Sequence, residues 1–138
     1  MSYLLDTNVI SELRKGERAD ADVRAWFDRL GEGEIYLSVL TLGEIRRGIE
    51  SVRRRDPGSA AALDSWLALL GEAHRDRILP LDRAIAEEWG RMNVPDPLPV
   101  VDGLLAATAK VTGLTLATPN IADVEAAGVE LRDPFASS

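Results

Sequence analysis

Short strand-like segments alternate with helical patterns along the whole chain, and this alternation constrains the fold more than any other feature. We expect strands over residues 2–6, 34–39, 78–81, 114–118 and 129–134. Apolar residues recur at helical spacing between them, which predicts helices over 7–14, 19–30, 41–55, 60–77, 83–93, 101–113 and, in part, 119–128. Pro57 and Gly58 are expected to end the third helix. The fold class is therefore α/β, with a parallel sheet covered on both faces and sites at the carboxyl ends of its strands.

The composition bounds the chemistry. A chain of 138 residues suits one domain, here residues 1–138. With no cysteine and one histidine, His74, disulfides, thiolate catalysis and zinc sites built from Cys or several His are excluded. The net charge of −7 argues against a simple basic nucleic-acid binder, but an enzyme that reaches phosphate through a bound cation is compatible with it. We see no signal peptide and no apolar run of membrane-span length, so we expect a cytoplasmic protein without a membrane partner.

Two carboxylates occupy positions that allow two interpretations. Asp6 directly follows the first expected strand, where it would either cap the next helix or face a site at the strand ends. Glu44 lies three residues after Thr41, which is the capping-box spacing, so its carboxylate would either bond back to the helix start or point toward the strand ends. Spacing alone leaves both alternatives open.

A third carboxylate lies in apolar surroundings. Asp102 is the only charged residue between positions 98 and 109, with Ala106 and Ala109 on its helical face and Leu105 beside them. Burial of such a carboxylate is costly unless a partner compensates its charge. The alternative is that it stabilises the helix start through the helix dipole.

A polar turn follows the fourth expected strand. Thr118 ends that strand, and Asn120 and Asp123 come just beyond it. Asn and Asp favour turns for local reasons, so this stretch has a purely structural explanation when taken alone.

The carboxylates make a stronger case together than separately, because the carboxyl ends of parallel strands converge on one edge. Two carboxylates about 4 Å apart repel by roughly 4 kcal/mol at an effective dielectric near 20. Three or four carboxylates at one place would need proton uptake or a divalent cation. Because all the ligands would be oxygen atoms, the expected cation is Mg²⁺ or Mn²⁺.

The ordered set of motifs resembles a known family, the PIN-domain ribonucleases, and specifically the VapC-type toxins of type II toxin–antitoxin systems. The matching segments cover residues 3–135 and read "LLDTNVISEL", "LSVLTLGEIRRGI", "ILPLDRAIAEEWGRM" and "VDGLLAATAKVTGLTLATPNIADVEAAGVELRDPF". The resemblance implies a three-layer α/β/α fold with a central, mostly parallel sheet. It also implies a metal-dependent endoribonuclease, with a small acidic pocket that binds Mg²⁺ or Mn²⁺ and activates water to hydrolyse RNA phosphodiester bonds.

The resemblance also implies roles for individual residues. The three acidic metal-site positions of the family match Asp6, Glu44 and Asp102; we expect Asp6 and Asp102 to bind the metal directly and Glu44 to act through water or position the nucleophile. The family's fourth motif is similar to Thr-Arg-Asn/Asp-x-x-Asp-Phe, but this chain has a proline after the threonine and a valine in place of the phenylalanine. The fourth ligand is therefore Asp123, or Asn120 through a water, or absent. The side chains expected to orient carboxylates or water are those of Thr7, Asn8, Thr118 and Asn120.

The expected partners are RNA, a cognate antitoxin and a second copy of the chain. Arg46 and Arg47 are the preferred candidates for phosphate contacts, because they are the closest basic residues to Glu44 in sequence. The resemblance implies the antitoxin and a homodimer. The expected helix at 60–77 is compatible with a dimer surface, because it is more apolar than one core-facing stripe requires, although burial within its own domain would explain it equally well; the residues concerned are Trp66, Leu67, Leu69 and Leu70.

Other classes fit less well. A haloacid-dehalogenase-type phosphotransferase needs Asp-x-Asp after the first strand, but Asn8 stands at the third position. A receiver-type signalling domain needs a lysine after a late strand, and Lys110 comes before it. A degenerate, non-catalytic PIN domain that binds RNA or a partner remains as the alternative, because Asn120 is neutral.

Overall fold

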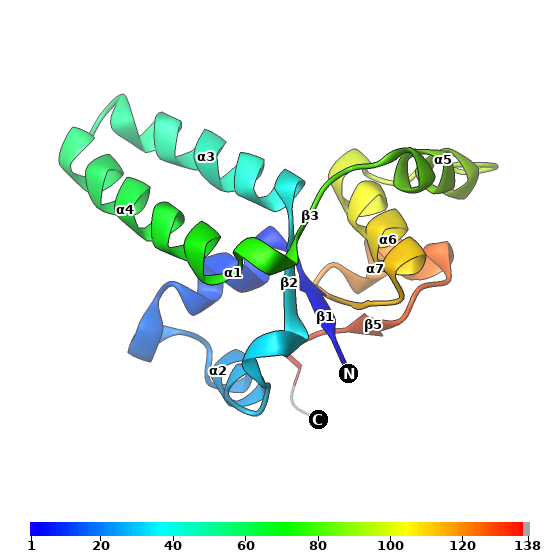
Figure 1. Cartoon of the computed structure of the whole chain (residues 1–138), viewed down its shortest axis with the longest axis horizontal. Coiled ribbons are helices and arrows are strands. Elements are labelled where there is room, and N and C mark those ends of the chain that lie inside the picture. The colour runs from blue at the N-terminus through cyan, green and yellow to red at the C-terminus, as the bar shows by residue number, and fades with distance from the viewer. Residues whose placement is uncertain (137–138) are drawn as a thin grey trace.

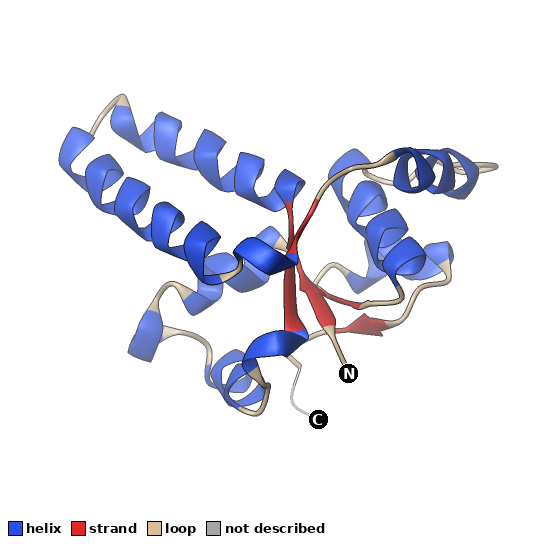
Figure 2. Cartoon of the chain, viewed as in Figure 1, coloured by secondary structure: helices blue, strands red, loops and turns tan. Residues whose placement is uncertain are grey.

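A five-stranded parallel sheet forms the centre of the computed structural model, which describes residues 1–136 apart from the side chain of Glu32 (Figure 2). The strands lie in the order β3-β2-β1-β4-β5, and all four pairings are parallel. Their bounds are β1 Tyr3–Leu5, β2 Ile35–Ser38, β3 Ile78–Leu79, β4 Thr115–Ala117 and β5 Leu131–Arg132. The expected strands are all present, and each is shorter than expected.

Helices connect the strands and cover both faces of the sheet. The α-helices are α1 Thr7–Leu13, α2 Ala21–Asp28, α3 Val39–Arg53, α4 Pro57–Ala73, α5 Arg83–Met92, α6 Val100–Thr112 and α7 Ile121–Val124. Short 3-10 turns complete the connections; they are η1 Gly16–Arg18, η2 Glu32–Glu34, η3 Arg75–Arg77 and η4 Glu125–Ala127.

Neighbouring side chains of one strand point to opposite faces of the sheet and so build two separate cores. Leu5 and Leu37 are buried in a cluster with apolar residues of α1, α2, α3 and α4. Leu4 and Leu116 are buried in a second cluster with residues of α6 and α7. In Figure 1 the helices α1–α4 accordingly lie on the left of the sheet and α5–α7 on the right. The predicted three-layer α/β/α fold is confirmed.

Helices α3 and α4 begin two and three residues earlier than the sequence patterns predict. Ser38 caps α3, because its Oγ accepts a hydrogen bond from Leu40 N at 3.0 Å, and Thr41 lies fully buried inside the helix. The capping box between Thr41 and Glu44 is therefore wrong. Pro57 does not separate two helices but opens α4, where a proline in the first turn loses no hydrogen bond and Asp56 supplies the cap.

Helices α3 and α4 form an arm that projects from the sheet (Figure 1). Across this arm, Asp64 of α4 accepts hydrogen bonds from Arg46 at 2.7 Å and Arg53 at 2.7 and 2.9 Å. The apolar side of α4 is used inside the domain: Trp66, Leu67 and Leu70 all pack against the core. These three side chains are only partly buried and Leu69 is 71% exposed, so the dimer surface considered for this helix stays a prediction.

None of the helices in residues 1–136 combines the length and the apolar character needed to cross a bilayer.

Candidate active site

The ends of β1 and β4 lie side by side at the point where the sheet changes its winding direction. From β1 the chain winds outward through β2 and β3, and it then crosses to β4 on the other side of β1. Asp6 N donates to Ala117 O at 3.0 Å, so the first residue after β1 lies against the last residue of β4. Open parallel sheets form a crevice at such a switch point, beyond the carboxyl ends of the strands.

Asp6 is both a helix cap and a wall of this crevice. Its Oδ1 accepts a hydrogen bond from Val9 N at 3.0 Å, which caps α1. Its other carboxylate oxygen, Oδ2, accepts a hydrogen bond from the Thr118 hydroxyl, whose oxygen in turn accepts one from Asn120 N at 3.0 Å. The two interpretations of Asp6 left open by the sequence are therefore compatible with each other.

Glu44 is held by α1 rather than by the start of its own helix. The Thr7 hydroxyl donates to Glu44 Oε1 at 2.5 Å and thereby joins α1 to α3 above the sheet edge. This bond, and not a capping interaction, determines where the Glu44 carboxylate lies.

Asp102 enters from the opposite layer, in the first turn of α6. Neighbouring Gly103 is buried, and a Cβ at that position would lie 3.3 Å from both Leu98 Cβ and Trp89 Nε1. Glycine therefore allows the start of α6 to pack closely on Trp89 of α5, at the residue next to Asp102.

These side chains line one cavity of about 280 Å³. Its lining residues are Asp6, Thr7, Asn8, Glu44, Pro99, Val101, Asp102, Leu105 and Asn120. The structure thus brings together the three predicted acidic residues with Thr7, Asn8 and Asn120. Thr118 lies beneath the cavity, where it holds Asp6, and exposed Asp123 is not part of the lining.

Sequence reasoning missed the apolar part of the lining. Pro99 and Val101 were not singled out, although Val101 directly precedes Asp102 and that adjacency was an available signal. These side chains keep one wall of the cavity apolar, which increases the cost of an uncompensated charge there.

Burial dominates the electrostatics of the cavity. It raises the pKa of Asp6, and the charge of Asp102 raises it further, while the hydrogen bonds from Thr118 and Val9 oppose the change. Burial also raises the pKa of Asp102; the Asn120 side chain lowers it, and the charges of Asp123 and Glu44 raise it. Asp123 therefore acts on the site through its charge.

The donor set fits a hard cation held partly through water. The polar lining presents oxygen ligands, and the raised pKa values mark carboxylates whose negative charge lacks a compensating positive charge. In residues 1–136, however, no group of three or more Asp, Glu or His side chains is close enough to hold one ion directly. Mg²⁺ keeps several of its waters when bound to proteins, so this arrangement suits it better than it suits an ion that needs a complete protein cage.

The two arginines predicted to contact RNA have different surroundings. Arg46 is engaged with Glu50 at 3.2 Å and Asp64 at 2.7 Å, on the arm formed by α3 and α4. Arg47 lines a second hollow next to the acidic cavity, together with Glu44.

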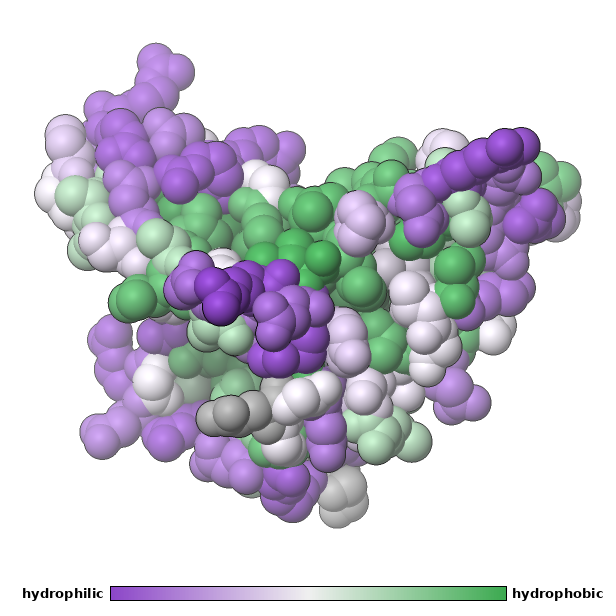
Figure 3. Space-filling model, viewed as in Figure 1, coloured by the Kyte–Doolittle hydropathy of each residue, from purple (hydrophilic) through white to green (hydrophobic). Residues whose placement is uncertain are grey.

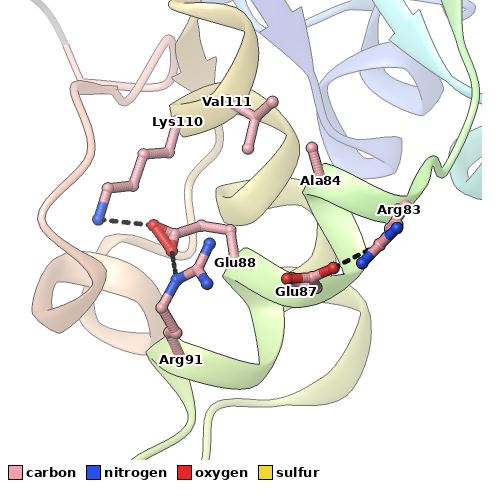
Figure 4. A pocket seen from close by; sticks show the side chains of 7 residues that line it. All are labelled: Arg83, Ala84, Glu87, Glu88, Arg91, Lys110 and Val111. Carbon is pink, nitrogen blue, oxygen red and sulfur yellow. Dashed lines mark hydrogen bonds and ion pairs between the residues drawn. The ribbon is translucent and has the colours of Figure 1, made fainter.

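A larger hollow on the outer side of α5 and α6 has a different character (Figure 4). Its charges pair with each other: Glu88 binds Lys110 at 3.0 Å and Arg91 at 3.2 Å. Lys110 is thus engaged outside the acidic cavity, which it does not line, and this excludes the receiver-type arrangement in which a lysine serves the acidic site.

The fold and the site define an α/β protein with an acidic cavity at the switch point, and comparison with known proteins agrees with this fold. The model of the PIN domain family matches residues 3–122. The chain is 34% identical to VapC ribonuclease Y4jK of Sinorhizobium fredii, over 96% of each protein. It is 32% identical to toxin FitB of Neisseria gonorrhoeae, over 96% of this chain and 97% of the relative. A solved structure of FitAB bound to an IR36 DNA fragment superposes with a TM-score of 0.88 at 30% identity, over 99% of this chain and 97% of the other. The chain belongs to the PIN domain family.

Proposed function

We propose that this protein is a single-domain, metal-dependent endoribonuclease and the toxin of a toxin–antitoxin pair, acting on RNA in the cytoplasm. The observation that carries the proposal is the cavity at the β1–β4 switch point, which Asp6, Glu44 and Asp102 all line and where burial raises the pKa of Asp6 and Asp102. The ribonuclease and toxin names of relatives that align along nearly the whole chain support the same activity.

The chain's own residues divide the work of phosphodiester hydrolysis. Asp6 and Asp102 would hold the cation from two layers of the fold, and the Thr118 hydroxyl keeps the Asp6 carboxylate in place. Thr7 holds Glu44, which would orient a water molecule toward the phosphate. When bound, Mg²⁺ or Mn²⁺ supplies activation of that water and stabilises the charge that grows on the phosphate. No histidine base is needed.

The fourth polar position is assigned to Asn120, with support from Asp123. Asn120 lines the cavity and its side chain interacts with Asp102, whereas Asp123 adds negative charge from outside the lining. Asn120 therefore orients Asp102 or a metal-bound water, and Asp123 increases the attraction of the site for a cation.

The proposed partners are a cognate antitoxin and a second copy of the chain. FitAB, whose solved structure resembles this fold along nearly its whole length, is a complex, and FitB is named a toxin. The antitoxin would keep the nuclease inactive until it is released.

The proposal is tested by RNA cleavage with purified protein in Mg²⁺ or Mn²⁺, with and without chelator. We expect cleavage that chelator abolishes, and inactive Asp6→Asn and Asp102→Asn variants that keep the wild-type circular dichroism spectrum. Wild-type activity in either variant would contradict the assignment of these residues.

A non-catalytic PIN domain that binds RNA or a partner is the second candidate. It is favoured by neutral Asn120 and by the absence, among residues 1–136, of three acidic or histidine side chains close enough to hold an ion directly. RNA binding without metal-dependent cleavage would support it, and cleavage at catalytic protein concentrations would reject it.

A further inference from the structure

A second hollow opens beside the acidic cavity, at the start of α3. Its volume is about 290 Å³, and its lining residues are Val39, Leu40, Gly43, Glu44 and Arg47. Glu44 lines both hollows, so a molecule that reaches the acidic cavity can extend directly into the second one.

The floor of this hollow is aliphatic. Val39 is 42% exposed and Leu40 is partly buried, so their side chains present apolar surface to solvent at the edge of the site. Figure 3 shows hydrophobic surface gathered in the recess between the start of α3 and the helices α5 and α6. An exposed apolar surface next to charged groups is typical of a binding site.

The charge of the hollow comes from Arg47. No acidic side chain of the described residues forms an ion pair with Arg47, whereas Arg46 and Arg53 of the same helix are both bound to Glu50 and Asp64. The Arg47 guanidinium is therefore available to a ligand, either to stack on a planar ring or to approach a phosphate.

Gly43 keeps the hollow open. A Cβ added at this position would meet no atom within 4 Å, so packing in the protein does not require glycine there. Glycine also weakens a helix interior. Because Gly43 lines the hollow and has no side chain, it leaves this space open to a ligand.

We propose that this hollow binds one unstacked base of the RNA, next to the phosphate held in the acidic cavity. This inference rests on the proposed ribonuclease function. Single-stranded RNA is recognised by splaying out bases and stacking them on aromatic rings or arginine planes, and an aliphatic floor with one available guanidinium suits such a base. The hollow is shallow and open to solvent, so a flat ring system can lie against its aliphatic floor.

The test compares intact single-stranded RNA with the same RNA carrying an abasic ribose at each position in turn. In the wild type, we expect one position beside the cleaved bond where removal of the base slows cleavage roughly five- to hundredfold, as for the loss of one stacked base. In Gly43→Leu, leucine fills the hollow, so the intact and abasic RNAs at that position should be cleaved at similar rates. Arg47→Ala should reduce the difference in cleavage rate between the intact RNA and the RNA that is abasic at that position.

Gly48→Leu is the matched control. Gly48 lies in the same helix, is exposed, and a Cβ there also meets no atom within 4 Å, but it does not line the hollow. This variant should keep the wild-type difference between intact and abasic RNA.

Each failure has its own signature. Wild-type protein that cleaves no RNA in Mg²⁺ or Mn²⁺ defeats the proposed function and this inference with it. Wild-type protein that cleaves RNA without a base-dependent position, or a Gly43→Leu variant that keeps the wild-type difference, overturns the base-binding hollow alone. Light scattering on Gly43→Leu gives a further outcome: a change of oligomeric state with an unchanged base dependence would assign the hollow to contact between two copies of the chain.

Discussion

The hydroxyl of Thr118 donates a hydrogen bond to the carboxylate of Asp6, across 112 residues of sequence. The bond joins the end of β4 to the end of β1 and lies directly under the acidic cavity. Because Thr118 Oγ1 also accepts a hydrogen bond from Asn120 N at 3.0 Å, one hydroxyl places two of the residues that line the cavity. The predicted role of Thr118 in orienting a carboxylate has this geometric basis.

Thr118→Val should reduce both stability and activity. Valine has nearly the same shape but leaves a buried oxygen of Asp6, which is 3% exposed, without its donor, at a cost of roughly 1–3 kcal/mol. Residues that orient a metal ligand typically contribute about 10–100-fold to metal affinity or activity. Loss of the bond also raises the pKa of Asp6 further, so the acidic limb of the pH–activity profile should move to higher pH.

Thr41→Val is the control for this substitution. Thr41 is also fully buried, but its hydroxyl oxygen has no hydrogen-bond partner among the described residues. Valine there removes an unsatisfied polar group, so the free energy of unfolding should stay the same or increase. Equal losses in the two variants, measured by urea unfolding, would contradict the role assigned to Thr118.

Asp102→Asn should stabilise the metal-free protein at pH 7. Because the pKa of Asp102 is raised in the folded state, its ionised form costs stability above that pKa, and the cost disappears as pH falls below the ordinary carboxyl value of about 4. Thermal unfolding in chelator should therefore give a higher midpoint for the variant at pH 7, with the difference shrinking toward pH 4.

Addition of Mn²⁺ should make the wild type more stable than Asp102→Asn at pH 7. A ligand at 100 times its dissociation constant stabilises the folded state by about 2.7 kcal/mol, and the wild type should gain this where the variant does not. If Asp102→Asn is the less stable protein in chelator at pH 7, the carboxylate already has a compensating partner and its charge does not await a cation.

Gly103→Ala should displace Asp102 and reduce cleavage. The new Cβ would lie 3.3 Å from Trp89 Nε1 and Leu98 Cβ, so α6 must shift by a few tenths of an ångström at the residue next to the carboxylate. Trp89→Phe removes the Nε1 edge, whose nitrogen is buried without a partner. Combining the two substitutions should restore part of the lost kcat, and kinetic assays of both single variants and the double variant measure this coupling.

Gly90→Ala separates this effect from general helix stability. Gly90 lies in α5, is exposed, and a Cβ there meets nothing within 4 Å, so alanine should stabilise by roughly 0.5–1 kcal/mol without loss of activity. For the double variant Gly103→Ala/Trp89→Phe, a loss of kcat equal to the combined losses of the two single variants would be the contrary result. It would show that the close packing of α5 on α6 does not position Asp102.

The parts of the fold that could be predicted are those that depend on local pattern. Short segments such as residues 2–6 and 114–118 predicted strands, and their alternation with helices predicted a parallel sheet with its site at the strand ends. The start of α3 could not be predicted as well, because Ser38 and Thr41 are both good capping residues and only the packing of Thr41 into the core decides between them.

The parts of the site that could not be predicted depend on contacts far apart in sequence. The sequence could not show that Arg46 binds Asp64, because this partner lies 18 residues away across the turn between α3 and α4; a contact of Arg46 with RNA stays a prediction. No sequence pattern indicates the contact between Trp89 and Gly103. Asp6 was predicted correctly as a residue at the sheet edge. The sequence could not choose between this role and the cap because one carboxylate has two oxygen atoms: Oδ1 caps α1, and Oδ2 accepts the hydrogen bond from Thr118.

The most direct test of the central claim is Mn²⁺ binding to the wild type and to Asp102→Asn by titration calorimetry. The claim is that carboxylates from two layers of the fold share a cation at the end of β1. We predict that the wild type binds Mn²⁺ and that the variant binds it at least tenfold more weakly, the lower end of the loss expected for perturbing such a site. A wild type that binds no Mn²⁺, or a variant that binds it as tightly as the wild type, would contradict the claim.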